Sequence, residues 1–314
     1  MSIQPDKTWR TSIITKSAAN IAIVFPALNE CKAMGKILDD VKLALIGYNY
    51  QTVVVDGHST DGTDKIAKSK GAVVIYQPGK GYGDALKTGF LYAKNQLDSQ
   101  VIVMLDADLT YDPQDIPKLV EPILKDKADL VVGNRFPGME KGAMPFVNQI
   151  GNRAISMLAN LSLAIGISDT QSGMRAFKAE LLDELNLMAV GMPFALEMLA
   201  KARSVNARML ELPIVYKPRV GETKLSPLRD GSRIFSVIVR LMFDVRPLLF
   251  FGIIGTFLGA WGFFLHYVLL PIEIAYVIFP LLLIIGGLLS FLVGFAIYVE
   301  KEDIKKLSHL SDST

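Results

Sequence analysis

The sequence predicts an α/β protein whose mostly parallel sheet is followed by a pair of membrane-spanning helices. Three observations lead to this prediction. Short apolar runs alternate with helix-like stretches over residues 21–226. Polar clusters come directly after several of these runs. Charged residues almost disappear from residues 248–299. The first two features favour a sheet with a ligand site at one edge, and the third favours a membrane anchor.

The expected strands are apolar and rich in β-branched residues, and the stretches between them have helical spacing. The strands are expected at 21–25, 52–56, 72–76, 101–105 and 129–133, and the helices near 32–46, 62–70, 82–96 and 114–125. Continuous apolar strands that alternate with helices are typical of a parallel, doubly wound sheet. Ligands of such sheets bind beyond the carboxyl ends of the strands.

Composition excludes several classes of protein. Hydrophobic residues make up 51% and charged residues 20%, which rules out intrinsic disorder, a collagen-like repeat and a disulfide scaffold. The net charge of +2, without a basic tract interleaved with aromatics, offers no support for nucleic-acid binding. Cys31 is the single cysteine, so an intramolecular disulfide and a multi-thiolate metal site are both excluded.

The C-terminal block predicts a transmembrane hairpin. Residues 248–270 and 274–299 carry no formal charge, and each segment exceeds the roughly 20 helical residues that a bilayer core requires. Only Pro271, Ile272 and Glu273 separate them, so both outer ends return to one side. The alternative is a buried helical hairpin in the core of a soluble protein. Oligomerisation through the hairpin is a further expectation.

The charges that flank the hairpin predict its orientation. Arginines precede the first span and lysines follow the second, whereas the turn has neither: Arg229, Arg233, Arg240, Arg246, Lys301, Lys305 and Lys306. The positive-inside rule then puts the main domain and both termini in the cytosol, at the plasma membrane if the source is prokaryotic. Residues 230–243 carry an apolar stripe with arginines beside it, which suits a helix in the membrane interface or one packed on the soluble domain.

These observations divide the chain into five parts. We expect a polar N-terminal lead-in at 1–20, an α/β domain at 21–226, a juxtamembrane amphipathic helix at 227–247, the hairpin at 248–299 and a cytosolic tail at 300–314.

Four polar clusters follow the predicted strands and should converge on one edge of the sheet, as in a nucleotide site. They are Pro26–Glu30, Asp56–Thr63, Asp106–Asp108 and Gly133–Phe136. The Asp106-Ala107-Asp108 stretch has a direct chemical rationale. Mg²⁺ and Mn²⁺ take carboxylate and diphosphate oxygens, and alternate residues at a strand end can place one carboxylate on the metal and the other on a neighbouring group.

Several stretches together resemble glycosyltransferase family 2, of the GT-A fold, and within it the polyprenyl-phosphate glycosyltransferases. The stretches are FPALNE, VVDGHSTDGT, GKGYGDALKTGF, MLDADLTYDP, GNRF, DTQSGMRAF, FALEMLAKA and ELPIVYKPRVGETKL, and the resemblance runs from about Ile21 to Val299. The resemblance implies a Rossmann-like cytosolic domain that carries interfacial helices and the hairpin.

The resemblance also implies roles for matched positions. Nucleotide-sugar contacts would come from Pro26, Asn29, Glu30, Asp56, Asp106, Gln171, Ser172, Arg219 and Lys224. Asp108, with Asp106 beside it, would hold Mg²⁺ or Mn²⁺. Acceptor phosphate or active-site electrostatics would involve Arg135, Arg153 and Arg175, and the catalytic set would be Asp106, Asp108, Arg135, Arg219 and Lys224. Many relatives carry two acids where this chain has Asp56-Gly57, which leaves the preferred nucleobase open.

The implied reaction is an inverting transfer of a hexose from a nucleotide-diphosphate sugar, of the GDP-mannose or UDP-glucose type, to dolichol phosphate or another polyprenyl phosphate. The expected partners are therefore the donor, the lipid acceptor and the bilayer, without nucleic acid. One alternative is a membrane-bound polysaccharide or glycolipid synthase of the same family, although neither Trp9 nor Trp261 follows an arginine as the synthase signature requires. The other is a non-enzymatic, membrane-anchored nucleotide sensor.

Overall fold

The computed structural model describes residues 20–189, 191–220, 227–269 and 278–311. The lead-in up to residue 19 and Lys224 therefore lie outside the described residues. The chain divides into two compact units, one made of residues 1–156 and 167–227 and the other of residues 157–166 and 228–314.

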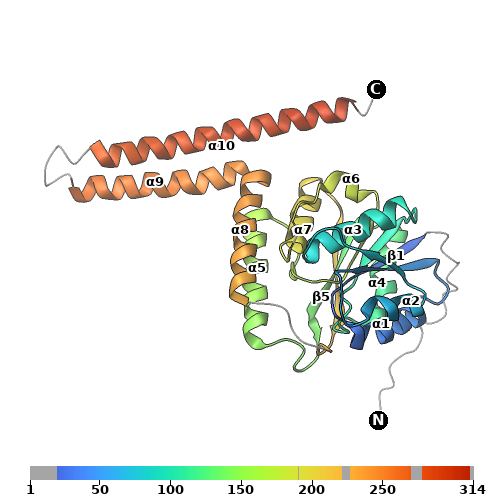
Figure 1. The fold of residues 1–314 in the computed structure, drawn as a ribbon. Helices are drawn as coiled ribbons and strands as arrows, with labels where there is room; N and C mark the ends of the chain where they lie inside the picture. The colour runs from blue at the N-terminus through green and yellow to red at the C-terminus, as the bar shows by residue number, and fades with distance from the viewer. Residues whose placement is uncertain (1–19, 190, 221–226, 270–277, 312–314) are drawn as a thin grey trace, which may run out of the picture. The chain divides into compact units, whose positions relative to one another are not determined.

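The first unit contains a seven-stranded sheet with the strand order β3-β2-β1-β4-β6-β5-β7 (Figure 1). The strands are β1 (Ile21–Ala27), β2 (Tyr50–Asp56), β3 (Val73–Tyr76), β4 (Val101–Met104), β5 (Leu130–Met139), β6 (Arg175–Lys178) and β7 (Met209–Tyr216). Neighbouring strands are parallel except at β6, which runs antiparallel to β4 and to β5. This confirms the mostly parallel sheet, and the five predicted strands correspond to β1–β5.

The helices of this unit lie between successive strands of the sheet. They are α1 (Cys31–Ala44), α2 (Thr63–Ser69), α3 (Tyr82–Asn95), α4 (Ile116–Leu124), α5 (Phe146–Leu163), α6 (Leu181–Leu185) and α7 (Phe194–Ser204), with a 3₁₀ turn at Pro113–Asp115. The four predicted helices correspond to α1–α4. The last residues of α5 belong to the second unit.

The core lies on both faces of the sheet. Met34, Ile37 and Val41 of α1 are fully buried against one face. On the other face α3 approaches β1 and β2 closely, because Gly89 has no side chain: a Cβ there would lie 2.4 Å from a methyl carbon of Val24. Close packing from both sides holds the strands rigidly and so fixes the positions of the loops at their carboxyl ends.

The second unit contains α8 (Pro227–Val245), α9 (Pro247–Leu269) and α10 (Ile278–Ser311). Figure 1 shows α9 and α10 side by side, and they are antiparallel, since Gly262 faces Pro280 while Gly255 faces Gly287. Both are long and apolar enough to cross a membrane, and only 11% and 17% of their most apolar windows are buried. Such exposure disagrees with the alternative of a soluble core hairpin.

Helix α8 is amphipathic, as predicted. On one side of the helix Ile234, Ile238 and Leu241 are buried. Phe235, Val239 and Phe243 are exposed along a neighbouring side of the helix. These three side chains recur every four residues, and they form the apolar side that α8 offers to its surroundings.

Candidate active site at the carboxyl edge of the sheet

The loops after β1 and β2 meet because these strands are parallel neighbours in register. The side-chain oxygen of Asn29 accepts a hydrogen bond from the Thr60 backbone at 2.8 Å, and the Asn29 backbone donates to Ser59 Oγ at 2.9 Å. Asn29 adopts a positive φ of 51°, which an asparagine tolerates and which turns the chain into this contact. Two predicted clusters therefore form one surface.

Asp61 joins the same two loops, and the sequence analysis did not single it out. Its Oδ2 atom accepts from the Cys31 backbone at the start of α1, and its Oδ1 atom accepts from the Thr63 backbone at the start of α2, each at 3.0 Å. Desolvation raises the pKa of Asp61, but the hydrogen bonds from Thr63 and Cys31 outweigh it and hold the pKa below its usual value. The signal was an aspartate just before a helix start.

Asp56, at the end of β2, presents an unused acceptor. Its side chain is almost entirely buried, and its Oδ1 atom accepts from the Ser59 backbone at 2.7 Å. Its Oδ2 atom is buried and has no hydrogen-bond partner within the described part of the chain. A buried acceptor without a donor is costly, so this oxygen suits an N–H group of a bound ligand.

The two carboxylates after β4 are held by different groups. Oδ1 of Asp106 accepts from the Tyr82 hydroxyl at 2.9 Å. Oδ1 of Asp108 accepts from the Thr110 hydroxyl at 2.6 Å and from the Thr110 backbone at 3.1 Å. Burial, reinforced by repulsion from the Asp108 charge, raises the pKa of Asp106 to about 7, against the lowering effect of the Tyr82 hydrogen bond. Neither Tyr82 nor Thr110 was among the predicted site residues.

Arg219 reaches this edge from the loop after β7. Its Nη2 atom lies 2.7 Å from Oε1 of Glu30, and its Nη1 atom lies 3.2 Å from Oδ2 of Asp108. The structure thus brings three predicted residues together, although Lys224 of the same predicted loop lies outside the described residues. A guanidinium between two carboxylates shows that the position attracts positive charge.

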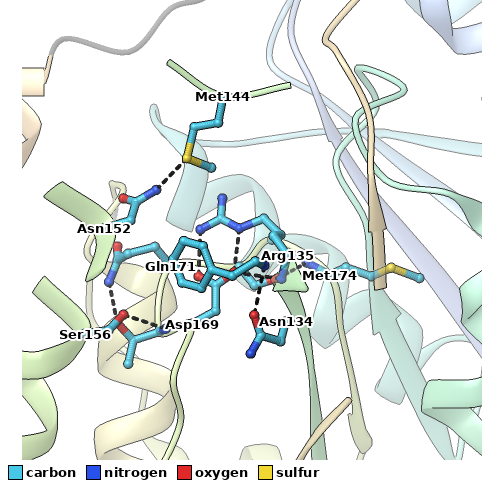
Figure 2. A network of polar contacts seen from close by, with 12 residues as sticks. Asn134, Arg135, Met144, Asn152, Ser156, Asp169, Gln171 and Met174 are labelled. Carbon is cyan, nitrogen blue, oxygen red and sulfur yellow. Dashed lines mark hydrogen bonds and ion pairs between the residues drawn. The ribbon is translucent and has the colours of Figure 1, made fainter. Parts of the chain in front are cut away.

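Arg135 lies deeper, in a buried ion pair (Figure 2). Its Nε and Nη2 atoms contact the two carboxylate oxygens of Asp169, each at 2.7 Å, and Asp169 is fully buried. The guanidinium carbon of Arg135 also lies 5.4 Å from the centroid of the Tyr216 ring. Its role toward an acceptor phosphate therefore stays a prediction, and the observed contacts are those of a structural ion pair.

Arg175 and Arg153, which were predicted beside the acceptor phosphate, differ in their surroundings. Arg175 is fully buried and donates to the backbone carbonyls of Ser172, Ala195 and Thr170 at 3.1, 2.5 and 2.9 Å. Desolvation lowers the pKa of Arg175 to about 10. Arg153 is exposed on α5, with its guanidinium carbon 4.9 Å from the Phe136 ring centroid. Of the two, only Arg153 is open to an outside ligand in this conformation.

The turn before β6 supplies the remaining predicted contacts. Gln171 Nε2 donates to Thr170 Oγ1 at 3.0 Å, and that hydroxyl also lies 3.0 Å from Ser156 Oγ, in the network that Figure 2 shows. Ser172 is fully buried, and its hydroxyl accepts from the Met174 backbone at 3.3 Å. The turn is thus rigid, and Gln171 is its partly exposed member.

Glu197 of α7 approaches the same region but is occupied. Its buried carboxylate accepts from the Met188 backbone at 3.0 Å and from the Ala189 backbone at 2.7 Å, and it forms an ion pair with Lys201 at 3.1 Å. These contacts make Glu197 the support of the segment before α7. A carboxylate so committed is a poor candidate for a general base.

The donor set suits a divalent cation that is bound together with a diphosphate. Within the described residues, no three His, Cys, Asp or Glu side chains gather as a complete metal site. Asp106 and Asp108 supply two carboxylates from alternate positions just after β4. Mg²⁺ and Mn²⁺ commonly bind through one or two carboxylates together with substrate phosphates. The two carboxylates therefore fit such an ion.

Sequence comparison places the chain among known glycosyltransferases. The family model described as "Glycosyl transferase family 2" matches residues 22–185. The chain is 37% identical over 219 residues to the low-salt glycan biosynthesis hexosyltransferase Agl6 of Haloferax volcanii, and the match covers 69% of this chain but only 52% of that protein. It is 35% identical over 229 residues to the dolichyl-phosphate hexose transferase of the same organism, and the match covers 72% of this chain and 96% of that protein.

Structural comparison agrees on the fold. Glucosyl-3-phosphoglycerate synthase from Mycobacterium tuberculosis, crystallised with Mn²⁺, UDP-glucose and phosphoglyceric acid, superposes with a TM-score of 0.58 at 21% identity. The match covers 72% of this chain and 81% of that structure. At this identity the likeness concerns the GT-A-like arrangement of the sheet and its helices.

Proposed function

Because the chain belongs to glycosyltransferase family 2, we propose that it transfers a hexose from a nucleoside diphosphate sugar to dolichol phosphate or another polyprenyl phosphate. The donor is of the GDP-mannose or UDP-glucose type, and the anomeric centre is inverted. The observation that carries this proposal is the Asp106–Asp108 pair beside Arg219 on a chain with two membrane-length helices. A relative that is named as a dolichyl-phosphate hexose transferase adds support.

The donor site uses residues from the ends of four strands, β1, β2, β4 and β7. Asp56 offers its free oxygen to an N–H of the nucleobase, and Asn29 and Glu30 line the same edge. Asp108, with Asp106 beside it, would hold Mg²⁺ or Mn²⁺, and such an ion would supply Lewis-acid stabilisation of the leaving diphosphate. The guanidinium of Arg219 lies beside Asp108. Together with Lys224, it stabilises the leaving diphosphate by charge-assisted hydrogen bonds.

The nucleophile needs no protein base. A phosphate monoester has its second pKa near 6, so a lipid phosphate is already largely ionised at neutral pH. This agrees with the contacts of Glu197, whose carboxylate holds backbone amides instead of facing an acceptor. Arg153, exposed over Phe136, is the cation that we assign to the acceptor phosphate, and we assign to Arg135 the role of a buried electrostatic support.

The hairpin holds the catalytic domain at the membrane where the acceptor resides. The arginines before α9 and the lysines that follow the second apolar span support, by the positive-inside rule, a cytosolic position for the catalytic domain and both termini. Cysteines introduced at Ser2 and at Ile272 should differ in their labelling by a membrane-impermeant maleimide in sealed cells, with only the Ile272 position labelled. Labelling of Ser2 instead would reverse the proposed orientation.

The decisive experiment is a donor panel. Full-length protein in detergent is given GDP-mannose, UDP-glucose and related sugars with Mn²⁺ and a radiolabelled polyprenyl phosphate. We expect one glycosyl-lipid product and release of one nucleoside diphosphate per transfer. Formation of a long polymer would favour the polysaccharide synthase alternative, and nucleotide binding without any transfer would favour a sensor.

A further inference from the structure

The Asp106 carboxylate is enclosed by groups from two distant parts of the chain. The Tyr82 hydroxyl, on the first residue of α3, donates to Oδ1 at 2.9 Å. On the other side Gly173 faces Oδ2, and a Cβ on that glycine would lie 2.4 Å from this oxygen. Oδ1 thus accepts a hydrogen bond from Tyr82, and Oδ2 packs closely against the backbone at Gly173. The side-chain rotamer of Asp106 is therefore fixed by residues outside its own strand.

Tyr82 is itself held in place by tight packing around the next residue. A Cβ on Gly83 would lie 2.4 Å from the Ala189 carbonyl oxygen and 3.0 Å from Cβ of Phe194. The segment that carries Ala189 is fastened by Glu197, which accepts from the Ala189 backbone at 2.7 Å. The start of α3 therefore has little freedom to shift, and the Tyr82 hydroxyl stays within hydrogen-bond distance of Asp106 Oδ1.

Gly173 is equally fixed. Its backbone N–H donates to the Tyr111 hydroxyl at 2.6 Å, and the turn before it is fastened by Arg175, which donates to the carbonyls of Ser172 and Thr170. Both sides of the Asp106 enclosure therefore belong to well-anchored backbone.

The neighbouring Asp108 is supported differently. Its Oδ1 atom is bonded by Thr110, only two residues further along the chain. Asp108 is thus oriented by a local turn and by its ion pair with Arg219, whereas Asp106 depends on α3 and on the turn before β6. A carboxylate at a strand end without such support samples several rotamers, and a donor site loses affinity when a ligand must restore one of them.

We propose that Tyr82 is a positioning residue that holds the Asp106 carboxylate in the orientation that the nucleotide and its divalent ion require. The proposal rests on the donor site proposed above. Tyr82 acts through Asp106 and through its hydroxyl, because the ring alone cannot donate a hydrogen bond to the carboxylate.

The test is a double-mutant cycle on equilibrium binding. Full-length protein in detergent is titrated with UDP and with GDP, each with Mn²⁺ present and absent, and the cycle uses whichever nucleotide binds more tightly. Tyr82→Phe removes only the hydroxyl, and we expect binding with Mn²⁺ to weaken about 10-fold, since a hydrogen bond to a charged group is lost. In the Asp106→Ala background the same substitution should change binding less than about 2-fold, because no side-chain oxygen remains there to accept from the hydroxyl.

Tyr50→Phe is the matched control. Tyr50 is partly buried at the amino end of β2, whereas the candidate site lies at the carboxyl ends of the strands. This variant should therefore bind nucleotide as the wild type does. Gly173→Ala, which pushes on the other oxygen of Asp106, should weaken the same binding and serves as the second variant if Tyr82→Phe does not fold. Wild-type-like binding by Tyr82→Phe, or an equal loss in both backgrounds, would overturn the proposal. The assay contains no lipid, so a failed transfer to polyprenyl phosphate would leave its result unaffected.

Discussion

Arg219 and Asp108 form an ion pair in which Nη1 of the arginine lies 3.2 Å from Oδ2 of the aspartate. The pair joins the loop after β7 to the end of β4, and the second amino group of the guanidinium contacts Glu30. Asp108 thus occupies the centre of the candidate site, where a cation and a diphosphate would both have to be accommodated.

Asp108→Ala should abolish transfer while leaving the fold intact. The residue lies beyond the end of β4, and its loss removes the first ligand of the divalent ion, so we expect turnover to fall at least about 100-fold. Asp183→Ala, which alters an exposed carboxylate that is paired with Lys94, is the control and should keep full turnover. EDTA should stop the wild-type protein, and an Asp108→Ala variant that transfers normally with Mn²⁺ would disprove the assignment.

Asp169→Ala should be strongly destabilising. It would leave the Arg135 guanidinium buried without its carboxylate, and breaking a buried ion pair costs about 3–5 kcal/mol. At about 2–4 °C per kcal/mol for a domain of this size, the thermal midpoint of the detergent-solubilised protein should fall by about 10 °C. Asp126→Ala removes a surface carboxylate that pairs with Arg208, and its midpoint should change by no more than about 3 °C.

The ion pairs of Asp129 with Arg208 and Lys178 predict a pH dependence of the free energy of unfolding. Hydrogen bonds from Arg208, with further contributions from Lys178, hold the pKa of Asp129 well below its usual range. Its folded-state pKa is therefore lower than its unfolded value of about 3.9, so the stabilisation is present above that pH and is lost as the pH falls toward the folded value. We expect Asp129→Asn to cost about 1 kcal/mol at pH 7, and the difference from wild type to shrink below pH 4.

Thermal midpoints of both proteins at pH 7, 5, 4 and 3 would measure this difference. The variant should unfold at a lower temperature than the wild type at pH 7 and pH 5, and the difference between the two proteins should become smaller at pH 3. A gap that stays constant over the whole range would mean that the charge of Asp129 contributes nothing.

Gly255→Leu should disrupt the hairpin. A Cβ at this position would lie 2.6 Å from the Gly287 carbonyl oxygen, so a larger side chain must force α9 and α10 apart. Overpacking of this kind costs about 1–3 kcal/mol. Gly259→Leu is the matched control, since a Cβ there meets no atom within 4 Å. The thermal midpoint of the detergent-solubilised protein would report the loss, with a clear fall expected only for Gly255→Leu.

The strands β1–β5, the helices α1–α4 and the two long apolar helices could be predicted from the sequence because their signals are local. An apolar run such as 101–105 needs only its own residues to indicate a buried strand, and an uncharged segment of more than 20 residues needs only its length to indicate a span. The parallel order of the strands then put the clusters of Asn29, Asp56 and Asp108 at one edge, by a general rule of such sheets.

Only the tertiary structure decided what each polar side chain contacts. The Tyr82–Asp106 bond spans 24 residues of sequence, the Gly173–Tyr111 bond spans 62, and the antiparallel insertion of β6 between β4 and β5 puts the turn before it beside the carboxylates. The same packing commits Arg135 to Asp169 and Arg175 to backbone carbonyls. Partners of this kind are chosen by close packing and by the cost of an unsatisfied buried charge, and both depend on segments that meet only after folding.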